Sequence, residues 1–122
     1  MKVFKVEKKV KIDKEKVIKY QLLTFCFLND IQISNSDLAF LTELSKFNTH
    51  ELTSFCNYIS KMKIFKSPQS VRNAVTKAEK KNLIVKNGVN KKNIKINPKI
   101  KIQTEGTILL DYKILGIEPK EV

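Results

Sequence analysis

Residues 67–97 form the part of the sequence that most constrains the fold. Ser67 followed by Pro68 is typical of a helix start, because serine can cap the first turn and proline at the first helical position loses no hydrogen bond. The helix is predicted to run to about Lys81, with apolar and polar side chains on opposite faces. The alanines on the inner face indicate a close approach to a neighbouring helix. The side chains predicted to face inward are Val71, Ala74, Val75 and Ala78.

A β-hairpin is predicted directly after this helix. Residues 83–85 (Leu-Ile-Val) form the first strand, Asn87-Gly88 marks the turn, and residues 94–96 (Ile-Lys-Ile) alternate as a return strand should. Asn97-Pro98 ends the hairpin, because proline cannot donate a hydrogen bond to a strand ladder. The connection between the two strands contains Lys91 and Lys92.

Two helices are predicted near the start of the chain. The first runs from Lys14 to Leu28 after an Asp13 cap, and its apolar residues lie almost all round, as in a helix at the centre of a core. The second opens at Ser34, with Asp37 three residues later in a capping pattern, and continues through Phe47.

A third helix, to about Met62, has the most regular apolar spacing in the chain. Asn48 and Glu51 are predicted to cap it, and His50 is expected at its start, on the surface. Two cysteines cannot form a disulfide framework or a four-cysteine metal site, so both are expected to be buried free thiols. The apolar positions of this helix are Leu52, Phe55, Cys56 and Ile59, and the second cysteine of the chain is Cys26.

This order of helices, followed by a basic hairpin, is that of a winged helix-turn-helix. We therefore predict an α+β winged-helix domain over residues 13–103, with three to four helices and a hairpin wing. An extended arm at residues 1–12 and a strand or tail at residues 104–122 exceed what this fold needs. Their apolar residues are predicted either to extend the domain's own sheet or to pair with another copy. These arm residues are Val3, Val6, Ile108, Leu110, Tyr112 and Ile114.

The positive charge of the chain is concentrated in one segment. The net charge is +12, and residues 61–101 contain 12 lysines, Arg72 and a single acidic residue, Glu79. Residues 1–60 have a balance of +2 and residues 102–122 a balance of −2. Such a segment attracts polyanions, nucleic acid first among them. A lysine-rich solvated surface is the alternative interpretation.

The outward face of the helix at residues 67–81 is the candidate nucleic-acid contact. Gln69 and Asn73 suit adenine, and Arg72, the only arginine in the chain, suits guanine. A polar face that is merely solvated is the alternative, since most helices have one. Further residues are suited to phosphate contact: Thr76, Lys77, Lys80, Lys91 and Lys92.

The sequence contains no recognisable catalytic constellation. There is one histidine, no glycine-rich phosphate loop, and no spacing that pairs acidic residues on one face of a predicted helix. We therefore expect a protein without enzymatic activity, cofactor, metal or small-molecule substrate. The most apolar stretch, Leu22–Leu28, is too short to span a bilayer and the N-terminus lacks the apolar centre of a signal peptide, so we expect a soluble intracellular protein.

The middle third of the chain resembles winged-helix regulators and plasmid replication initiators. Residues 66–73 (KSPQSVRN) and 78–84 (AEKKNLI) resemble a recognition helix and first wing strand. Residues 93–98 (NIKINP) resemble the return strand of the initiator group. The pattern is shared by proteins of many functions, so the resemblance implies a fold more than a role.

A second resemblance extends over nearly the whole length. Residues 20–29 (YQLLTFCFLN), 67–73 (SPQSVRN) and 104–113 (TEGTILLDYK) are similar to small proteins from the structural-gene block of crAss-like tailed phages. The resemblance implies a ring or neck subunit between portal and tail. It also implies that the partners are further copies of the chain and other virion proteins such as the portal.

Three functions are therefore open at this point. The first is a virion structural subunit, located in the phage particle after synthesis in the host cytoplasm, which the whole-chain resemblance favours. The second is a dimeric DNA-binding regulator or initiator in the cytoplasm or nucleoid, which the residues alone favour. The third is an accessory protein that binds nucleic acid without sequence preference.

Overall fold

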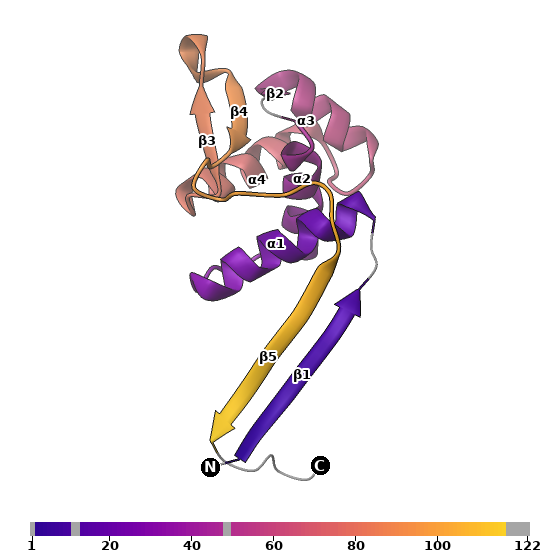
Figure 1. Ribbon diagram of the computed structural model, residues 1–122. Helices are drawn as coiled ribbons and strands as arrows, with labels where there is room; N and C mark the ends of the chain where they lie inside the picture. The colour runs from indigo at the N-terminus through magenta and orange to yellow at the C-terminus, as the bar shows by residue number, and fades with distance from the viewer. Residues whose placement is uncertain (1, 11–12, 48–49, 117–122) are drawn as a thin grey trace.

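The computed structural model describes residues 2–10, 13–47 and 50–116, which form an α+β structure (Figure 1). A short 3₁₀ turn, Val89–Lys91, lies between its third and fourth strands. The elements in chain order are β1 (Lys2–Val10), α1 (Lys14–Leu28), α2 (Asn35–Ser45), β2 (His50–Glu51), α3 (Leu52–Lys61), α4 (Pro68–Lys80), β3 (Ile84–Asn87), β4 (Asn93–Ile96) and β5 (Ile108–Gly116).

The predicted helix and hairpin at residues 67–97 are both confirmed. The Ser67 hydroxyl accepts a hydrogen bond from the Ser70 amide, and Pro68 begins α4. Strands β3 and β4 pair antiparallel, with Ile84 opposite Ile96 and Asn87 opposite Asn93. The sequence did not predict β2, which pairs with the other edge of β4 and completes a three-stranded sheet. Two residues are too few to produce a recognisable alternation.

The core lies where the four helices meet this sheet. Phe40 and Phe55 are fully buried and pack edge to face, with ring centroids 6.4 Å apart. The inner face of α4 is buried as predicted, and α4 packs against α3 and β3. Both cysteines are buried free thiols, and burial raises the pKa of each. The buried residues of α4 are Val71, Ala74, Val75 and Ala78.

The first two predicted helices form with the expected caps. Asp13 caps α1 by accepting from the Lys16 amide, and Ser34 caps α2 by accepting from the Asp37 amide. Helix α2 ends at Ser45, two residues before the predicted end at Phe47. The structure does not describe residues 48 and 49, so the predicted role of Asn48 lies outside the described residues.

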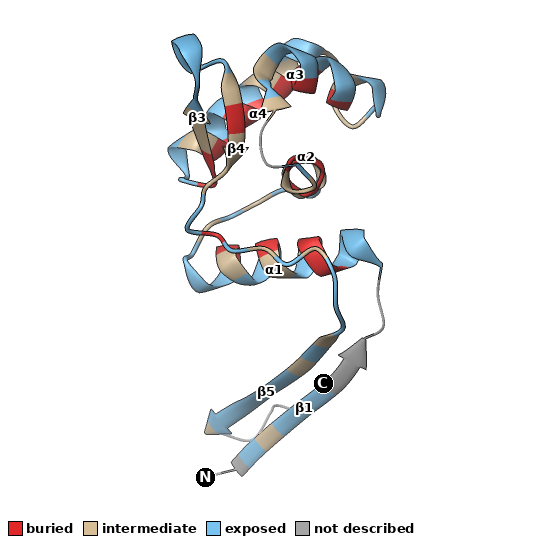
Figure 2. Cartoon of the chain, turned by 45° about the horizontal axis from the view of Figure 1, so that its top comes forward, coloured by how far each residue is buried: buried red, intermediate tan, exposed pale blue. Residues whose placement is uncertain are grey.

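The prediction that α1 is a central core helix is wrong. Only one side of α1 is buried, and Figure 2 shows that side facing α2. On the other side Leu23 is exposed, and Phe27 and Leu28 are 80% and 72% exposed. The sequence correctly indicated an apolar surface nearly all round the helix. The rest of the chain buries only one side of this apolar helix surface.

The prediction for His50 is wrong in part. His50 does directly precede the N-cap of α3, but it does not lie on the surface, because it is the first residue of β2 and is half-buried opposite Ile94. Its ring lies between two phenylalanine rings, with centroid distances of 4.5 Å to Phe47 and 5.1 Å to Phe55. The polarity of histidine suggested exposure, whereas the strand pairing fixes its side chain against the core.

The two arms pair with each other. Strands β1 and β5 form a separate antiparallel ribbon, with Lys2 opposite Gly116 and Val10 opposite Ile108. The ribbon does not extend the body's own sheet, so that predicted arrangement is wrong. Pairing of the arms with another copy stays a prediction, because the structure contains a single chain. In Figure 1 it projects from the α1 side of the molecule, at the opposite end from the β3–β4 hairpin.

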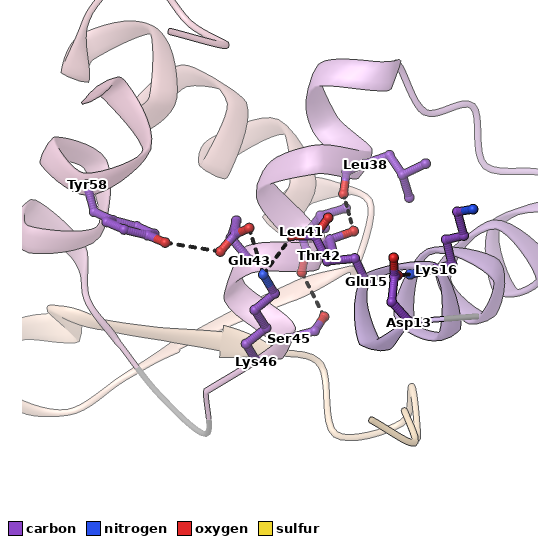
Figure 3. A network of polar contacts seen from close by, with 10 residues as sticks. All are labelled: Asp13, Glu15, Lys16, Leu38, Leu41, Thr42, Glu43, Ser45, Lys46 and Tyr58. Carbon is purple, nitrogen blue, oxygen red and sulfur yellow. Dashed lines mark hydrogen bonds and ion pairs between the residues drawn. The ribbon is translucent and has the colours of Figure 1, made fainter. Parts of the chain in front are cut away.

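A polar network joins α1, α2 and α3 (Figure 3). The buried Glu43 carboxylate accepts from the Tyr58 hydroxyl at 3.2 Å and from the Lys46 ammonium at 2.9 Å. The same ammonium lies 2.9 Å from Glu15 on α1. Burial acts to lower the pKa of Lys46, but its bonds to the two carboxylates outweigh this and raise it. The charge of Glu43 raises the pKa of Tyr58.

None of the helices in the described part of the chain has the length and apolar character needed to cross a membrane.

Phe55→Ala tests whether the body depends on this core. The substitution should lower the free energy of unfolding by about 3–5 kcal/mol, because it removes a fully buried ring and leaves a cavity. Urea unfolding followed by circular dichroism measures the change. The matched control is Phe27→Ala on the exposed side of α1, for which a change within about 0.5 kcal/mol is expected. Equal losses for the two variants would contradict this description of the core.

Candidate nucleic-acid interface

The outward face of α4 contains six of the predicted contact residues. Five of them are exposed, at positions that bring them to one side of the helix: Gln69, Asn73, Thr76, Lys77 and Lys80. Arg72 is half-buried at the edge of this face. The inner face of α4 is fixed in the core, so the outer face is held rigidly relative to the body.

Arg72 is held by a neighbouring helix. Its guanidinium donates to the Thr53 hydroxyl of α3 at 2.8 Å. A guanidinium has five N–H donors, so this bond leaves others for a further acceptor. The positive charge of Arg72 also acts to lower the pKa of Cys56, although burial of that thiol has the larger, opposite effect. Arg72 therefore braces α3 against α4 in addition to any contact outside the chain.

Three of the other polar side chains on this face are also engaged within the helix. The Gln69 amide donates to the Asn73 side-chain oxygen at 3.1 Å. The Thr76 hydroxyl donates to the Arg72 carbonyl at 3.0 Å. Within the described part of the chain, the ammonium groups of Lys77 and Lys80 form neither an ion pair nor a hydrogen bond. The lysines are thus the side chains most available to a partner.

The loop between β3 and β4, residues 88–92, is the predicted wing loop, and it places the remaining predicted residues on the surface. Lys91 and Lys92 are exposed, and the loop turns through Gly88, whose φ is +83°. A Cβ atom at Gly88 would lie 2.6 Å from the Asn93 side-chain nitrogen, so the turn requires glycine. The Leu52 amide donates to the Lys92 carbonyl at 2.7 Å. This bond ties the wing loop to the first turn of α3.

Little acidic charge opposes the basic segment. Glu79 is the single acidic residue among residues 61–101, and it lies 3.6 Å from the Lys86 ammonium. The Lys81 ammonium donates to the Gln32 carbonyl, which is uncharged. The fold therefore leaves most of the positive charge of this segment unneutralised on the surface of α4 and the hairpin.

The N-terminus of α3 already holds a negative charge. The Glu51 carboxylate accepts from the Thr53 amide at 3.1 Å and from the Ser54 amide at 2.7 Å. These bonds to the Ser54 and Thr53 amides lower the pKa of Glu51 to about 2. A helix N-terminus is a natural phosphate site, and here the chain's own carboxylate occupies it. The sequence indicated Glu51 as a partner of Asn48, whereas Glu51 is itself the N-cap.

The structure thus brings together the predicted nucleic-acid contact residues and separates them from the predicted arm residues. The α4 face and the wing loop belong to the same rigid body. The predicted arm residues lie on the β1–β5 ribbon at the other end of the molecule (Figure 1). Among the described residues, no three His, Cys, Asp or Glu side chains are grouped so that they could hold a metal ion.

No protein-family model matches this chain, and comparisons with curated proteins and with solved structures gave no significant match.

Glu51→Gln tests the cap of α3. The pKa of Glu51 is lower in the folded protein than its ordinary value of 4.5, so its charged form stabilises the fold. That stabilisation is complete above pH 4.5 and is lost as the pH falls toward 2. The variant should therefore be less stable near neutral pH, and the difference from the parent should shrink over this acid range. Urea unfolding at a series of pH values measures it, and a constant difference would contradict the assignment.

Proposed function

We propose that this chain is a non-enzymatic structural or adaptor subunit of a tailed-phage particle, of the head–tail connector kind, built on a winged-helix fold. The observation that carries the proposal is the β1–β5 ribbon, which holds an apolar face outside the body of the molecule. Its partners would be further copies of itself and other virion proteins such as the portal.

The winged-helix assignment is supported by the order of the elements. Helices α2, α3 and α4 are followed by the β3–β4 hairpin, and β2, between α2 and α3, joins that hairpin as a third strand. Helix α4 then stands where a recognition helix would, and the loop at residues 88–92 where a wing would.

The two faces of the ribbon differ in character. Directly opposite residues of an antiparallel pair share a face, and faces alternate along each strand. Phe4 opposes Ile114 and Val6 opposes Tyr112, whereas Lys5 opposes Lys113 and Glu7 opposes Asp111. The first face therefore holds most of the apolar residues, together with Lys2 and Lys8, and is called the apolar face. The other holds the charged pairs, together with Val3, Leu109 and Leu115, and is called the charged face. Of the six predicted arm residues, Val3 belongs to the charged face and the other five to the apolar face.

The apolar face lacks a partner within the described part of the chain. Val6, Tyr112 and Ile114 are 36%, 53% and 54% exposed. A two-stranded ribbon is marginally stable in water and cannot cover its own face. Contiguous exposed apolar surface on a soluble protein typically marks a protein contact. Assembly with other subunits would bury this face.

A second exposed apolar surface lies on α1, and it supports the same function. Leu23, Phe27 and Leu28 are exposed there, in the segment 20–29. The segment 104–113 contains the first six of the nine residues of β5. These are two of the three segments that resemble phage structural proteins, so the resemblance falls on the surfaces that a monomer leaves uncovered.

Substituting the apolar face tests this proposal. The wild-type chain should form an oligomer in 150 mM salt that is unchanged by random duplex DNA, as measured by multi-angle light scattering. Val6→Thr with Tyr112→Thr and Ile114→Thr should reduce its mass toward 14.1 kDa, because threonine keeps β-propensity but removes apolar area. The matched control, Lys5→Thr with Glu7→Thr, alters the opposite face and should leave the mass unchanged. A wild-type chain that is monomeric throughout would contradict the proposal.

A second candidate function is DNA binding as a regulator or replication initiator. The observation that favours it is the exposed, unopposed lysine set of α4 and the wing, Lys77, Lys80, Lys91 and Lys92. In a virion subunit the same lysines would face acidic groups of a neighbour or the packaged DNA. In a regulator they would contact phosphates while Gln69, Arg72 and Asn73 contact bases.

Lysine substitutions on α4 test the DNA contact. Lys77→Gln with Lys80→Gln should make the dependence of log affinity on log salt shallower by about two, because two phosphate contacts are lost. Fluorescence anisotropy with a random duplex measures the slope. The control, Lys14→Gln with Lys16→Gln, removes the same charge from the exposed start of α1. Identical slopes for the two pairs would mean that α4 does not contact DNA.

A further inference from the structure

In the sequence of β5, residues at equal distances before and after Tyr112 are of matching or complementary type. On either side of Tyr112 stand Asp111 and Lys113, which have opposite charges. The next positions outward are Leu110 and Ile114, and then Leu109 and Leu115, all of them apolar. A strand with this pattern is complementary to an antiparallel copy of itself.

The outer edge of β5 is open to such a copy. The ribbon has two strands, so one edge of each is unpaired within the described part of the chain. Lysines are common at exposed strand edges because they oppose the addition of another strand. Strand β1 has four lysines in nine residues, whereas β5 has one. The β5 edge is therefore the less protected of the two.

We propose that β5 pairs antiparallel with β5 of a second copy, with the two Tyr112 residues facing each other on a two-fold axis. This inference rests on the proposed self-assembly and identifies the contact that mediates it. In this register Asp111 faces Lys113 of the second copy, and Leu110 faces Ile114 of the second copy. Two ribbons then become one four-stranded sheet whose apolar face is continuous, since opposite residues share a face.

The charge pattern within the ribbon supports this register. Within one chain Lys5 lies directly opposite Lys113, and Glu7 directly opposite Asp111. Like charges directly opposite each other destabilise a strand pair. In the proposed dimer Lys113 gains an aspartate on its other side and Asp111 gains a lysine. Within the chain Lys5 already pairs with Glu7 at 2.6 Å, so the second copy supplies the opposite charges that Asp111 and Lys113 lack within the described part of the chain.

A groove at the base of the ribbon fits the same arrangement. It has a volume of about 430 Å³ and lies between α1 and the start of β5, with Tyr20, Thr24 and Leu28 on one side and Ile108 and Leu110 on the other. The proposed register puts Gly116 of the second copy opposite Ile108. The end of the partner strand therefore arrives beside this groove.

Charge reversals test the register. Asp111→Lys places lysine opposite Lys113 of the second copy, and Lys113→Asp places aspartate opposite Asp111 of the second copy. Either variant should weaken the dimer by about tenfold to a hundredfold, because the symmetric interface contains the pair twice. Within the chain each variant replaces a like-charge pair by an opposite-charge pair. Weaker association therefore cannot be attributed to a less stable ribbon.

Two combinations should restore association. A chain with both Asp111→Lys and Lys113→Asp regains complementary pairs and should dimerise like the wild type. An equal mixture of the two single variants should form a heterodimer, because one chain then presents two lysines and the other two aspartates. Analytical ultracentrifugation of the full chain measures each dissociation constant. Single variants that associate like the wild type, or combinations that fail to regain association, would overturn the inference.

A cysteine at the two-fold axis gives an independent measurement. Tyr112→Cys should form a disulfide-linked dimer under mild oxidation, because opposite Cβ atoms in an antiparallel pair are about 4.5–5.5 Å apart. Leu115→Cys is the control and should not cross-link, because Leu115 faces Leu109 of the second copy. The natural thiols Cys26 and Cys56 are buried. Cross-linking of both variants alike, or of neither, would overturn the register.

These measurements separate the inference from the proposed function. If the wild-type chain forms an oligomer that no β5 charge reversal affects, the chain is a self-assembling subunit but β5 is not its contact. If the wild-type chain remains monomeric, both proposals fail.

Discussion

The packing of α4 against α3 and the β3–β4 hairpin is the interaction on which the rest of the structure depends. The buried residues of α4 are Val71, Ala74, Val75 and Ala78. Because this inner face is fixed, the outer face presents its lysines in one direction. The hairpin is positioned by the same contact, and the bond from the Leu52 amide to the Lys92 carbonyl then sets the wing loop against α3. The candidate interface is therefore a consequence of how one apolar helix face is buried.

Much of the body could be predicted from the sequence because its signals are local. The Ser67-Pro68 start of α4, the spacing of Phe55, Cys56 and Ile59, and the alternation in β4 each involve neighbouring residues only. The features that could not be predicted are contacts between residues far apart in the sequence. The pairing of His50 with Ile94, the bond from Arg72 to Thr53, and the β1–β5 register depend on where separate segments meet. The exposed side of α1 was missed for a different reason, since an apolar helix surface does not reveal whether its cover comes from the same chain.

Charge and apolar surface occupy opposite ends of the molecule. The unopposed lysines lie on α4 and the wing, and most of the uncovered apolar side chains lie on the ribbon and α1, although Val89 on the wing loop is 81% exposed. A polyanion and a protein partner could therefore bind together without competing for the same residues. The internal bonds of Gln69, Arg72 and Asn73 occupy groups that base recognition would need, so the proposed nucleic-acid contact would be general and electrostatic rather than sequence-specific.

The pairing of β1 with β5 also has a consequence for how the chain folds. The two strands are separated by almost the whole sequence, so their association alone would require closing a very long loop, at a large cost in chain entropy. The folded body removes most of that cost, because the Gln21 side chain on α1 bonds both the amide and the carbonyl of Gln103, shortly before β5. The stability of the ribbon thus depends on the folded body. Unfolding of the core should also separate β1 from β5, whereas separation of the two strands should leave the core folded. Any contact made through the ribbon is consequently available only to correctly folded chains.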